Sequence, residues 1–316
     1  MTEGALHCLV ISDGRSGIEN QALGLAESCA ALRTMTVQSF HIQPGKVLAA
    51  LPPKAQLRLA KFNLPDCDIA IGCGRQAIAP LLYLKRSRPE IMTVYVQDPR
   101  MDPAAFDLVI APEHDDLRSE NVETMIGSPN RVTKEKIIGD TLDFAKGLTK
   151  LSMPRAAMLI GGTSKTHKLD LPSHEAHMAA AQTLLSQGYS LLITTSRRTP
   201  EFAVLAWRRF ASTFDTVWYH DGEGPNPYFA FLGGADIILV TEDSTNMLTE
   251  GCSTGKPIYR LPMAGKPGKF QQLYDALEIR CGVTRYNGQD GREEYVPLNE
   301  TARIAQIVWD KYDQRN

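Results

Sequence analysis

The sequence of 316 residues lacks several features that would assign its class at once. No apolar run approaches the roughly 18 residues of a membrane-spanning helix. The N-terminal segment MTEGALHCLVISDG has no basic region before its short apolar stretch, so we expect no secretory signal. The six cysteines contain no C-x-x-C pair, which favours reduced thiols in a cytoplasmic protein. A net charge of −2 provides no overall basic field for nucleic acid.

Signature motifs of several enzyme classes are also missing. The chain does not contain the phosphate-binding pattern G-x-x-x-x-G-K-[ST]. The letters of G-x-S-x-G occur at 251–255, but they follow an expected helix instead of a strand, so we expect no nucleophile elbow there. His174 and His177 lie three residues apart, which differs from H-E-x-x-H, and no third ligand is evident. We therefore expect a partly exposed helix face there, with no metal and no cofactor.

Short apolar runs alternate with helical patterns along the whole chain, which indicates an α/β protein with parallel sheets and helices on both faces. The expected strands are 6–11, 36–40, 68–71, 92–96 and 108–110, then 156–160, 191–194, 216–218, 237–240 and 257–259. The expected helices are 18–33, 76–85 and 133–146, then 172–186, 200–211, 227–232, 245–252 and 298–312.

The alternation occurs in two blocks, with a seam at 148–154. We expect an N-terminal Rossmann-like domain at 1–150 and a C-terminal one at 151–316, with the last helix, 298–312, packing back on the first domain. Ligands of doubly wound sheets bind at the carboxyl ends of the strands. Two facing doubly wound domains would therefore present these loops across a cleft between them.

Three strand ends of the second block carry polar loops that suit an anion. Their residues are Gly161, Gly162, Thr163, Ser164 and Lys165, then Ser196, Arg197, Arg198 and Thr199, then Asp243, Ser244 and Thr245. Paired glycines, arginines and helix starts all favour phosphate oxygens. A carboxylate nearby, Glu250, suits sugar hydroxyls. The alternative is a set of capped helices with solvent-facing charge.

The strand ends of the first block carry proton acceptors and glycines. Asp13, Asp98 and His114 are carboxylates and an imidazole that could take a proton at a cleft edge. The remaining loop residues of interest are Gly14, Arg15, Ser16, Gly74, Arg75 and Arg100. The pattern G-x-G-x-x-A at 72–77 resembles a dinucleotide fingerprint, but it follows the third expected strand, which disfavours an NAD site. Each of these residues could instead be a structural cap.

One segment concerns partners. The stretch 46–61, KVLAALPPKAQLRLAK, carries Lys46, Lys54, Arg58 and Lys61 among leucines and alanines and contains no acid. An amphipathic basic segment of this kind can lie on an anionic membrane surface. The alternative is a solvated helix face.

Five ordered motifs resemble the elongated-mitochondria (mitochondrial fission) family over nearly the whole chain. They are SDGRSGIENQALGLAE, VQDPR, LIGGTSKTHKL, TTSRRTP and NPYFAFLGGADIILVTEDSTNMLTEGCSTGKPIY. The resemblance implies a fold like that of the GT-B glycosyltransferases. It also implies that the second domain holds a nucleotide-sugar donor, with Glu250 on the ribose, and that the first domain faces the acceptor. The chain departs from well-studied GT-B enzymes in its first loop, which lacks a recognisable catalytic histidine motif and has Asp13 there.

These observations lead to a functional hypothesis with two alternatives. We expect a metal-independent glycosyltransferase that moves a sugar from a nucleotide-diphosphate donor to a lipid-linked or cell-envelope acceptor. Such a protein would be cytoplasmic or peripheral on the inner membrane. A non-enzymatic adaptor that binds a protein or membrane is the first alternative, and a nucleotide-sugar epimerase is the second.

Overall fold

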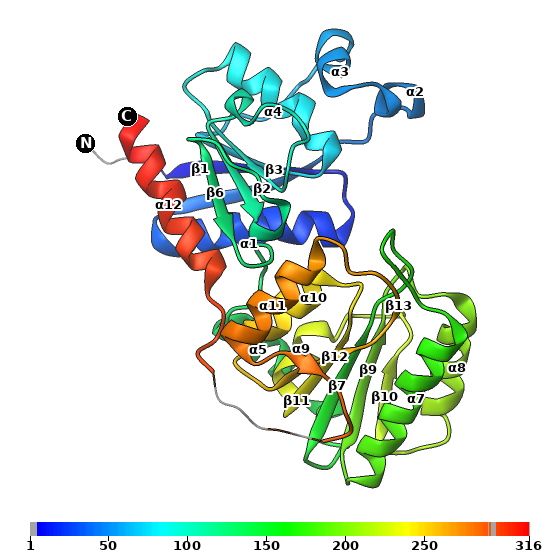
Figure 1. The fold of residues 1–316 in the computed structure, drawn as a ribbon. Coiled ribbons are helices and arrows are strands. Elements are labelled where there is room, and N and C mark those ends of the chain that lie inside the picture. The colour runs from blue at the N-terminus through cyan, green and yellow to red at the C-terminus, as the bar shows by residue number, and fades with distance from the viewer. Residues whose placement is uncertain (1–4, 290, 292–294, 316) are drawn as a thin grey trace. The chain divides into compact units, whose positions relative to one another are not determined.

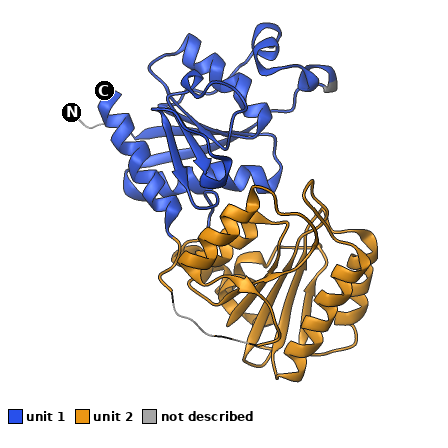
Figure 2. Ribbon diagram, in the orientation of Figure 1, with its two compact units in different colours: residues 1–131, 299–316 blue, residues 132–298 orange. Residues whose placement is uncertain are grey.

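The computed structural model describes residues 5–289, 291 and 295–315, apart from the side chain of Lys46. The chain forms two compact units, drawn in two colours in Figure 2. Unit 1 contains residues 1–131 and 299–316, and unit 2 contains residues 132–298.

Unit 1 is built on a six-stranded parallel sheet of strand order β2-β1-β3-β4-β5-β6. Its strands are β1 (Leu6–Ser12), β2 (Met35–His41), β3 (Ile69–Cys73), β4 (Met92–Val96), β5 (Leu108–Pro112) and β6 (Val122–Met125). Its helices are α1 (Ser16–Leu32), α2 (Lys46–Ala50), α3 (Pro53–Leu59), α4 (Arg75–Ser87) and α12 (Glu300–Arg315), with 3-10 turns at Pro103–Ala105 and Glu113–Asp115.

Helices cover both faces of the unit 1 sheet (Figure 1). On one face, α1 and α12 pack against a core that includes Val10, Ile71 and Trp309. The buried indole Nε1 of Trp309 donates to the carbonyl of Cys29 at 3.0 Å, which fastens α12 to α1. On the other face, α4 packs on Leu9 and neighbouring strand residues. Strands covered on both sides must be apolar throughout, which explains the uninterrupted hydrophobic runs.

Unit 2 repeats this architecture with strand order β10-β9-β7-β11-β12-β14, again with every neighbouring pair parallel. Its strands are β7 (Arg155–Ile160), β9 (Ser190–Thr195), β10 (Val217–His220), β11 (Ile237–Thr241), β12 (Ile258–Leu261) and β14 (Thr284–Arg285), with a separate antiparallel pair of β8 (His167–Lys168) and β13 (Ala264–Gly265). Its helices are α5 (Lys134–Asp143), α6 (Ala145–Leu148), α7 (Leu171–Ser186), α8 (Glu201–Ala211), α9 (Tyr228–Gly234), α10 (Thr245–Cys252) and α11 (Phe270–Cys281).

The fold class expected from the sequence is confirmed, since both sheets are parallel and helices accompany them (Figure 1). One core of unit 2 joins α7 and α8 to Met158, Ile193 and Leu239. On the opposite face, Gly251 of α10 lies so close to Ile258 that a side chain would not fit. Several elements were not expected from the sequence: α2, α3, β6, β8, β13, α11 and β14.

The division between the units differs from the expected seam at 148–154. It falls after residue 131, because α5 and α6 pack within unit 2. A side chain on Gly233 of α9 would collide with Thr141 of α5, and one on Gly147 of α6 would collide with the ring of Trp218. The chain returns to unit 1 at residue 299, so α12 belongs to unit 1.

The two histidines of α7 are buried, so the expectation of a partly exposed helix face was wrong. His174 is 4% exposed and His177 is fully buried. The His177 Nε2 lies 2.8 Å from the carbonyl oxygen of Pro262, and burial lowers its pKa to about 4. His174 packs edge-on against Phe202 and Trp207. Both imidazoles therefore belong to the core as neutral side chains.

Candidate functional site

The strand order of unit 2 places its central loops together. The chain enters the sheet at β7, continues to β9 and β10 on one side, and then crosses to β11 and β12 on the other. The direction of winding thus reverses between β7 and β11. Doubly wound sheets bind ligands at the carboxyl ends of the strands at such a switch point. The loops that follow β7, β9 and β11 meet there.

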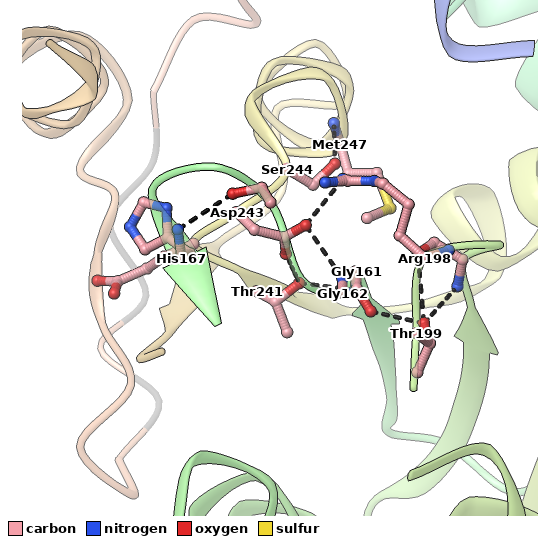
Figure 3. Close-up of polar contacts among 12 residues, drawn as sticks. Gly161, Gly162, His167, Arg198, Thr199, Thr241, Asp243, Ser244 and Met247 are labelled. Atoms are coloured by element: carbon pink, nitrogen blue, oxygen red, sulfur yellow. Dashed lines mark hydrogen bonds and ion pairs between the residues drawn. The ribbon is translucent and has the colours of Figure 1, made fainter. Parts of the chain in front are cut away.

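The carboxylate of Asp243 fastens these three loops to one another (Figure 3). It accepts hydrogen bonds from the Gly162 N–H at 3.0 Å and from the Thr241 hydroxyl at 2.8 Å. The Arg198 guanidinium forms an ion pair with it at 2.8 Å. Burial raises the pKa of Asp243, although Gly162 and Arg198 both act in the opposite direction. Its side chain has no exposed area, so its carboxylate positions the loops in this structure.

The two glycines after β7 are required by close packing. A side chain on Gly161 would collide with the Asp243 carboxylate, and one on Gly162 would collide with the backbone at Arg198. The Thr199 hydroxyl completes the junction by donating to the carbonyl of Gly161 at 2.5 Å. Gly161, Gly162 and Thr199 therefore join the loops internally.

The other residues expected around a nucleotide-sugar donor differ in their exposure to solvent. The exposed ones are Thr163, Lys165, Arg197 and Arg198, and the half-buried ones are Ser164, Ser196 and Thr245. Ser244 is buried, and its hydroxyl caps α10 by accepting from the N–H of Met247 at 3.4 Å. Cations and hydroxyls thus lie at the surface of a junction whose interior is fastened by Asp243. This arrangement can bind an anion without rearranging the loops.

Glu250 is buried in α10 and has one partner that the sequence did not indicate. The Tyr228 hydroxyl donates a short hydrogen bond to Glu250 Oε2. Burial raises the pKa of Glu250 to about 7, even though the bond from Tyr228 acts to lower it. A carboxyl group poised near neutral pH can exchange between donating and accepting hydrogen bonds.

A second buried carboxylate next to Asp243 was missed by the sequence reasoning. Glu242 accepts from Arg260 at 3.2 Å and from Arg285 Nε at 2.7 Å. It also accepts from the N–H of Met263 at 3.3 Å. Arg260 is the last-but-one residue of β12 and Arg285 is the last residue of β14, so both could have been found as cations at strand ends.

In unit 1, the loop after β1 is closed by an internal ion pair. Arg15 Nη2 lies 2.7 Å from Asp13 Oδ2, and Gly14 takes a left-handed conformation with φ of 77° between them. Burial alone would raise the pKa of Asp13, but the hydrogen bonds and charge of Arg15 outweigh it and lower the pKa. Asp13 is therefore ionised at neutral pH and is a weak base. Ser16 begins α1 directly afterwards.

The loop after β4 is organised in the same way. Arg100 binds Asp98 through its backbone N–H at 2.7 Å and its Nε at 3.0 Å. Gln97 and Arg100 have positive φ values of 92° and 56°, a conformation that side chains disfavour and that often occurs at functional sites. His114 is buried in the turn after β5, 3.9 Å from Asp115.

The loop after β3 serves a structural purpose. Gly74 has a φ of 83°, and Arg75 donates to the carbonyls of Ala49, Ala50 and Leu51. Arg75 therefore caps the end of α2 and is occupied by the protein itself.

The basic segment 46–61 forms α2 and α3 joined by a short turn. The side chains of Lys54, Arg58 and Lys61 are exposed, whereas that of Lys46 lies outside the described part of the structure. Val47 is 82% exposed and Leu59 is 69% exposed, which is unusual for large apolar side chains. The segment thus presents apolar and basic groups to its surroundings.

The described residues contain neither a metal-binding cluster nor a membrane-spanning helix. No group of three or more His, Cys, Asp or Glu side chains is arranged around a metal position. None of the described helices is both long and apolar enough to cross a membrane. All six cysteines, which lie within the described ranges, are free thiols.

Known proteins resemble this chain in sequence. A family model described as mitochondrial fission ELM1 matches residues 16–312. Mitochondrial fission protein ELM1 of Arabidopsis thaliana is 26% identical over 75% of this chain, which spans 62% of that relative's length. An uncharacterized protein of Rickettsia prowazekii is 26% identical over 95% of this chain and 96% of its own.

Solved structures show the fold. The UDP-GlcNAc 2-epimerase of Methanocaldococcus jannaschii superposes with a TM-score of 0.54 at 11% identity, over 96% of this chain and 100% of that one. The UDP-GlcNAc 2-epimerase of Neisseria meningitidis bound to UDP-GlcNAc gives a TM-score of 0.52 at 12% identity, over 98% and 93%.

The close packing at Gly162 predicts a strong local effect of one methyl group. We expect Gly162→Ala to lower the free energy of unfolding by about 1–3 kcal/mol, because the loops must separate to admit the side chain. Gly139→Ala is the matched control, since a side chain at this exposed position of α5 meets nothing within 4 Å. That control should stabilise by about 0.5–1 kcal/mol through helix propensity. Urea unfolding measures both, and equal effects would contradict the packing argument.

The raised pKa of Glu250 predicts how stability depends on pH. The folded state holds the proton up to about pH 7, whereas the unfolded state releases it near 4.5. Its contribution to stability is therefore complete below pH 4.5 and is lost as the pH rises through 7, by roughly 3 kcal/mol. In urea titrations, Glu250→Gln should remove this pH dependence of the free energy of unfolding. The variant should therefore become more stable relative to the wild type as the pH rises from 5 to 8. Parallel pH profiles would contradict the assignment.

Proposed function

Because this chain belongs to the mitochondrial fission ELM1 family and has a fold shared with nucleotide-sugar enzymes, we propose that it is a glycosyltransferase. In this proposal, unit 2 binds a nucleoside-diphosphate sugar and the sugar is transferred to a lipid-linked or cell-envelope acceptor. The observation that supports it most is the junction of three hydroxyl-bearing loops, two of which also carry cations, at the switch point of unit 2.

The diphosphate would contact the exposed parts of this junction. The Gly161–Lys165 loop would supply the exposed Thr163 hydroxyl and the Lys165 ammonium, because the N–H groups of Gly161, Gly162 and Ser164 already donate within the protein. The next loop would supply Arg197 and Arg198. The start of α10, capped by Ser244, adds its dipole. These groups would offset the negative charge that develops on the departing nucleoside diphosphate without a metal ion. Glu250 would accept hydrogen bonds from the ribose when it is ionised.

The acceptor hydroxyl needs a base, for which unit 1 offers three candidates. Asp13 is the first, with His114 and Asp98 as alternatives. The ion pair with Arg15 makes Asp13 a weak base in the free protein, so an acceptor that draws Arg15 away would raise its basicity. Gly14, Ser16, Gly74 and Arg100 would line the acceptor side, whereas Arg75 is occupied as a helix cap.

A lipid-linked acceptor would require contact with a membrane surface. The α2–α3 segment supports this part of the proposal, since its exposed Val47 and Leu59 accompany three exposed cations and no acid. A cytoplasmic protein held peripherally on the inner membrane would be the result.

We expect the α2–α3 segment to bind vesicles that contain phosphatidylglycerol. Sedimentation with such vesicles should fall several-fold in the triple variant K54E/R58E/K61E, since each basic residue near the surface contributes about 1 kcal/mol. The triple variant K134E/K146E/K150E, which changes three exposed lysines of unit 2, should sediment like the wild type. Equal loss in both variants, or none in either, would contradict a role for this segment.

An epimerase acting on the donor itself is the second candidate. The solved structures with a TM-score above 0.5 reported above are named UDP-GlcNAc 2-epimerases, and an epimerase would use the same junction in unit 2. It differs in requiring no acceptor, so incubation with a bound nucleotide sugar alone separates the two by the product formed. A non-enzymatic adaptor would bind no nucleotide sugar at all.

Nucleotide binding is the first test of the proposal. We expect one family of nucleoside diphosphates and its sugars to raise the melting temperature without magnesium, because ligands of the folded state stabilise it. Arg197→Ala should weaken this binding about tenfold through loss of a phosphate contact. Arg209→Ala is the control, because Arg209 is exposed in the last turn of α8, at the opposite end of that helix.

Two results would argue against the proposal. If no nucleotide or nucleotide sugar shifts the transition at millimolar concentration, the adaptor replaces the enzyme. If a nucleotide binds but Arg197→Ala and Arg209→Ala bind it equally well, the site lies elsewhere in the chain.

A further inference from the structure

A small two-stranded ribbon extends from the carboxyl edge of the unit 2 sheet. The strand β8 follows the loop after β7, and β13 follows β12. They pair antiparallel, with His167 opposite Gly265 and Lys168 opposite Ala264. The ribbon therefore joins the Gly161–Lys165 loop to a segment almost a hundred residues later in the chain, and it lies beside the candidate site.

The charged side chains of this ribbon are all positive. Residues 163–169 carry Lys165 and Lys168, and residues 262–269 carry Lys266 and Lys269. All four lysines are exposed, and neither segment contains an aspartate or glutamate. Across a chain with a net charge of −2, an acid-free ribbon with four exposed lysines is a local concentration of positive charge.

The ribbon is held firmly enough to present these lysines as a unit. The Ser164 hydroxyl accepts from the N–H of His167 at 3.1 Å, which closes the turn into β8. A side chain on Gly265 would collide with the carbonyl of Thr166, so the two strands approach as closely as glycine allows. The Lys266 N–H donates to that carbonyl at 3.2 Å.

The ribbon is also tied to the base of the candidate site. The N–H of Met263, just before β13, donates to the buried carboxylate of Glu242. The Tyr274 hydroxyl of α11 donates to the Glu242 carbonyl at 2.6 Å and lies 3.3 Å from His167 Nε2. Glu242 immediately precedes Asp243, so the residue that fastens the loops and the residue that anchors the ribbon are adjacent in sequence.

We propose that the β8–β13 ribbon binds the phosphate groups of a nucleoside diphosphate held at the switch point of unit 2, with Lys266 and Lys269 as its new contacts. This inference rests on the proposed function, because it concerns the same ligand. From the sequence, phosphate contacts were expected on the loops after β7, β9 and β11. The ribbon adds a fourth segment, after β12, whose lysines favour a ligand with two phosphates over one with a single phosphate or none.

The test compares two charge-reversal variants of unit 2. One is K266E/K269E, and the control is K146E/K150E, which makes the same change of charge at exposed lysines near the amino end of β7. The ligands are uridine, adenosine, guanosine and cytidine diphosphates, the corresponding monophosphates and nucleosides, and inorganic pyrophosphate. Dissociation constants are measured by calorimetry at low and at physiological ionic strength. K266Q/K269Q separates loss of the cations from repulsion by the introduced acids.

The expected result is specific to the phosphates. For the diphosphate that the wild type binds, K266E/K269E should raise the dissociation constant about tenfold at low ionic strength. K266Q/K269Q should raise it less. The preference for diphosphate over monophosphate should shrink, and the loss should diminish at higher ionic strength. The corresponding nucleoside should bind all variants equally, and K146E/K150E should match the wild type.

Other outcomes identify what has failed. If the wild type binds a diphosphate and K266E/K269E, with an unchanged melting temperature, binds it as well as K146E/K150E does, the ribbon inference is overturned and the proposed function stands. If K266E/K269E is unfolded, K266Q/K269Q decides by the same criterion. If the wild type binds none of the ligands, including pyrophosphate, both the inference and the proposed function are overturned.

Discussion

The candidate site depends on one buried carboxylate. Asp243 has no exposed area and interacts with Gly162, Thr241 and Arg198, which come from the loops and strand ends around β7, β9 and β11. A buried carboxylate is costly unless its oxygens are satisfied, so these partners are required to keep it there. The same requirement holds the three loops together, and it turns their exposed cations to one place. Stability of the unit and geometry of the site therefore have a common origin.

The fold could be predicted from the sequence to the extent that burial leaves a pattern. Strands covered on both faces, such as Ile69–Cys73 and Ile237–Thr241, must be apolar throughout, and they were found within two residues of their true ends. The strand Val122–Met125 was missed because it lies at the edge of the sheet and is half polar. Helix α11 was missed even though Leu273, Tyr274, Leu277 and Cys281 have helical spacing.

The boundary between the units could not be predicted, because helix spacing does not indicate which sheet a helix covers. The contacts that assign α5 and α6 to unit 2 involve Gly147 and Gly233, where the absence of a side chain admits a neighbour. The sequence shows the glycine but not the neighbour that packs against it. Likewise, the polar strand ends predicted which loops meet in unit 2. They did not predict which charged residues of those loops are buried, because Asp243 and Arg198 look alike in this respect in the sequence. Only their partners distinguish the buried one from the exposed one.

The two units share an architecture but use their arginines differently. In unit 1, Arg15 and Arg100 each pair with an aspartate two residues earlier in the same loop, at 2.7 and 3.0 Å, and Arg75 caps a helix. A local pair of this kind is neutral as a whole and offers little to an anion. In unit 2, the buried Asp243 and Glu242 each draw cations from distant segments to the edge of the sheet. Glu242 brings in Arg260 and Arg285, so one carboxylate is matched by two cations, and the edge keeps an excess of positive charge. This contrast in charge, more than the shared fold, is our reason for proposing that a phosphorylated ligand binds to unit 2.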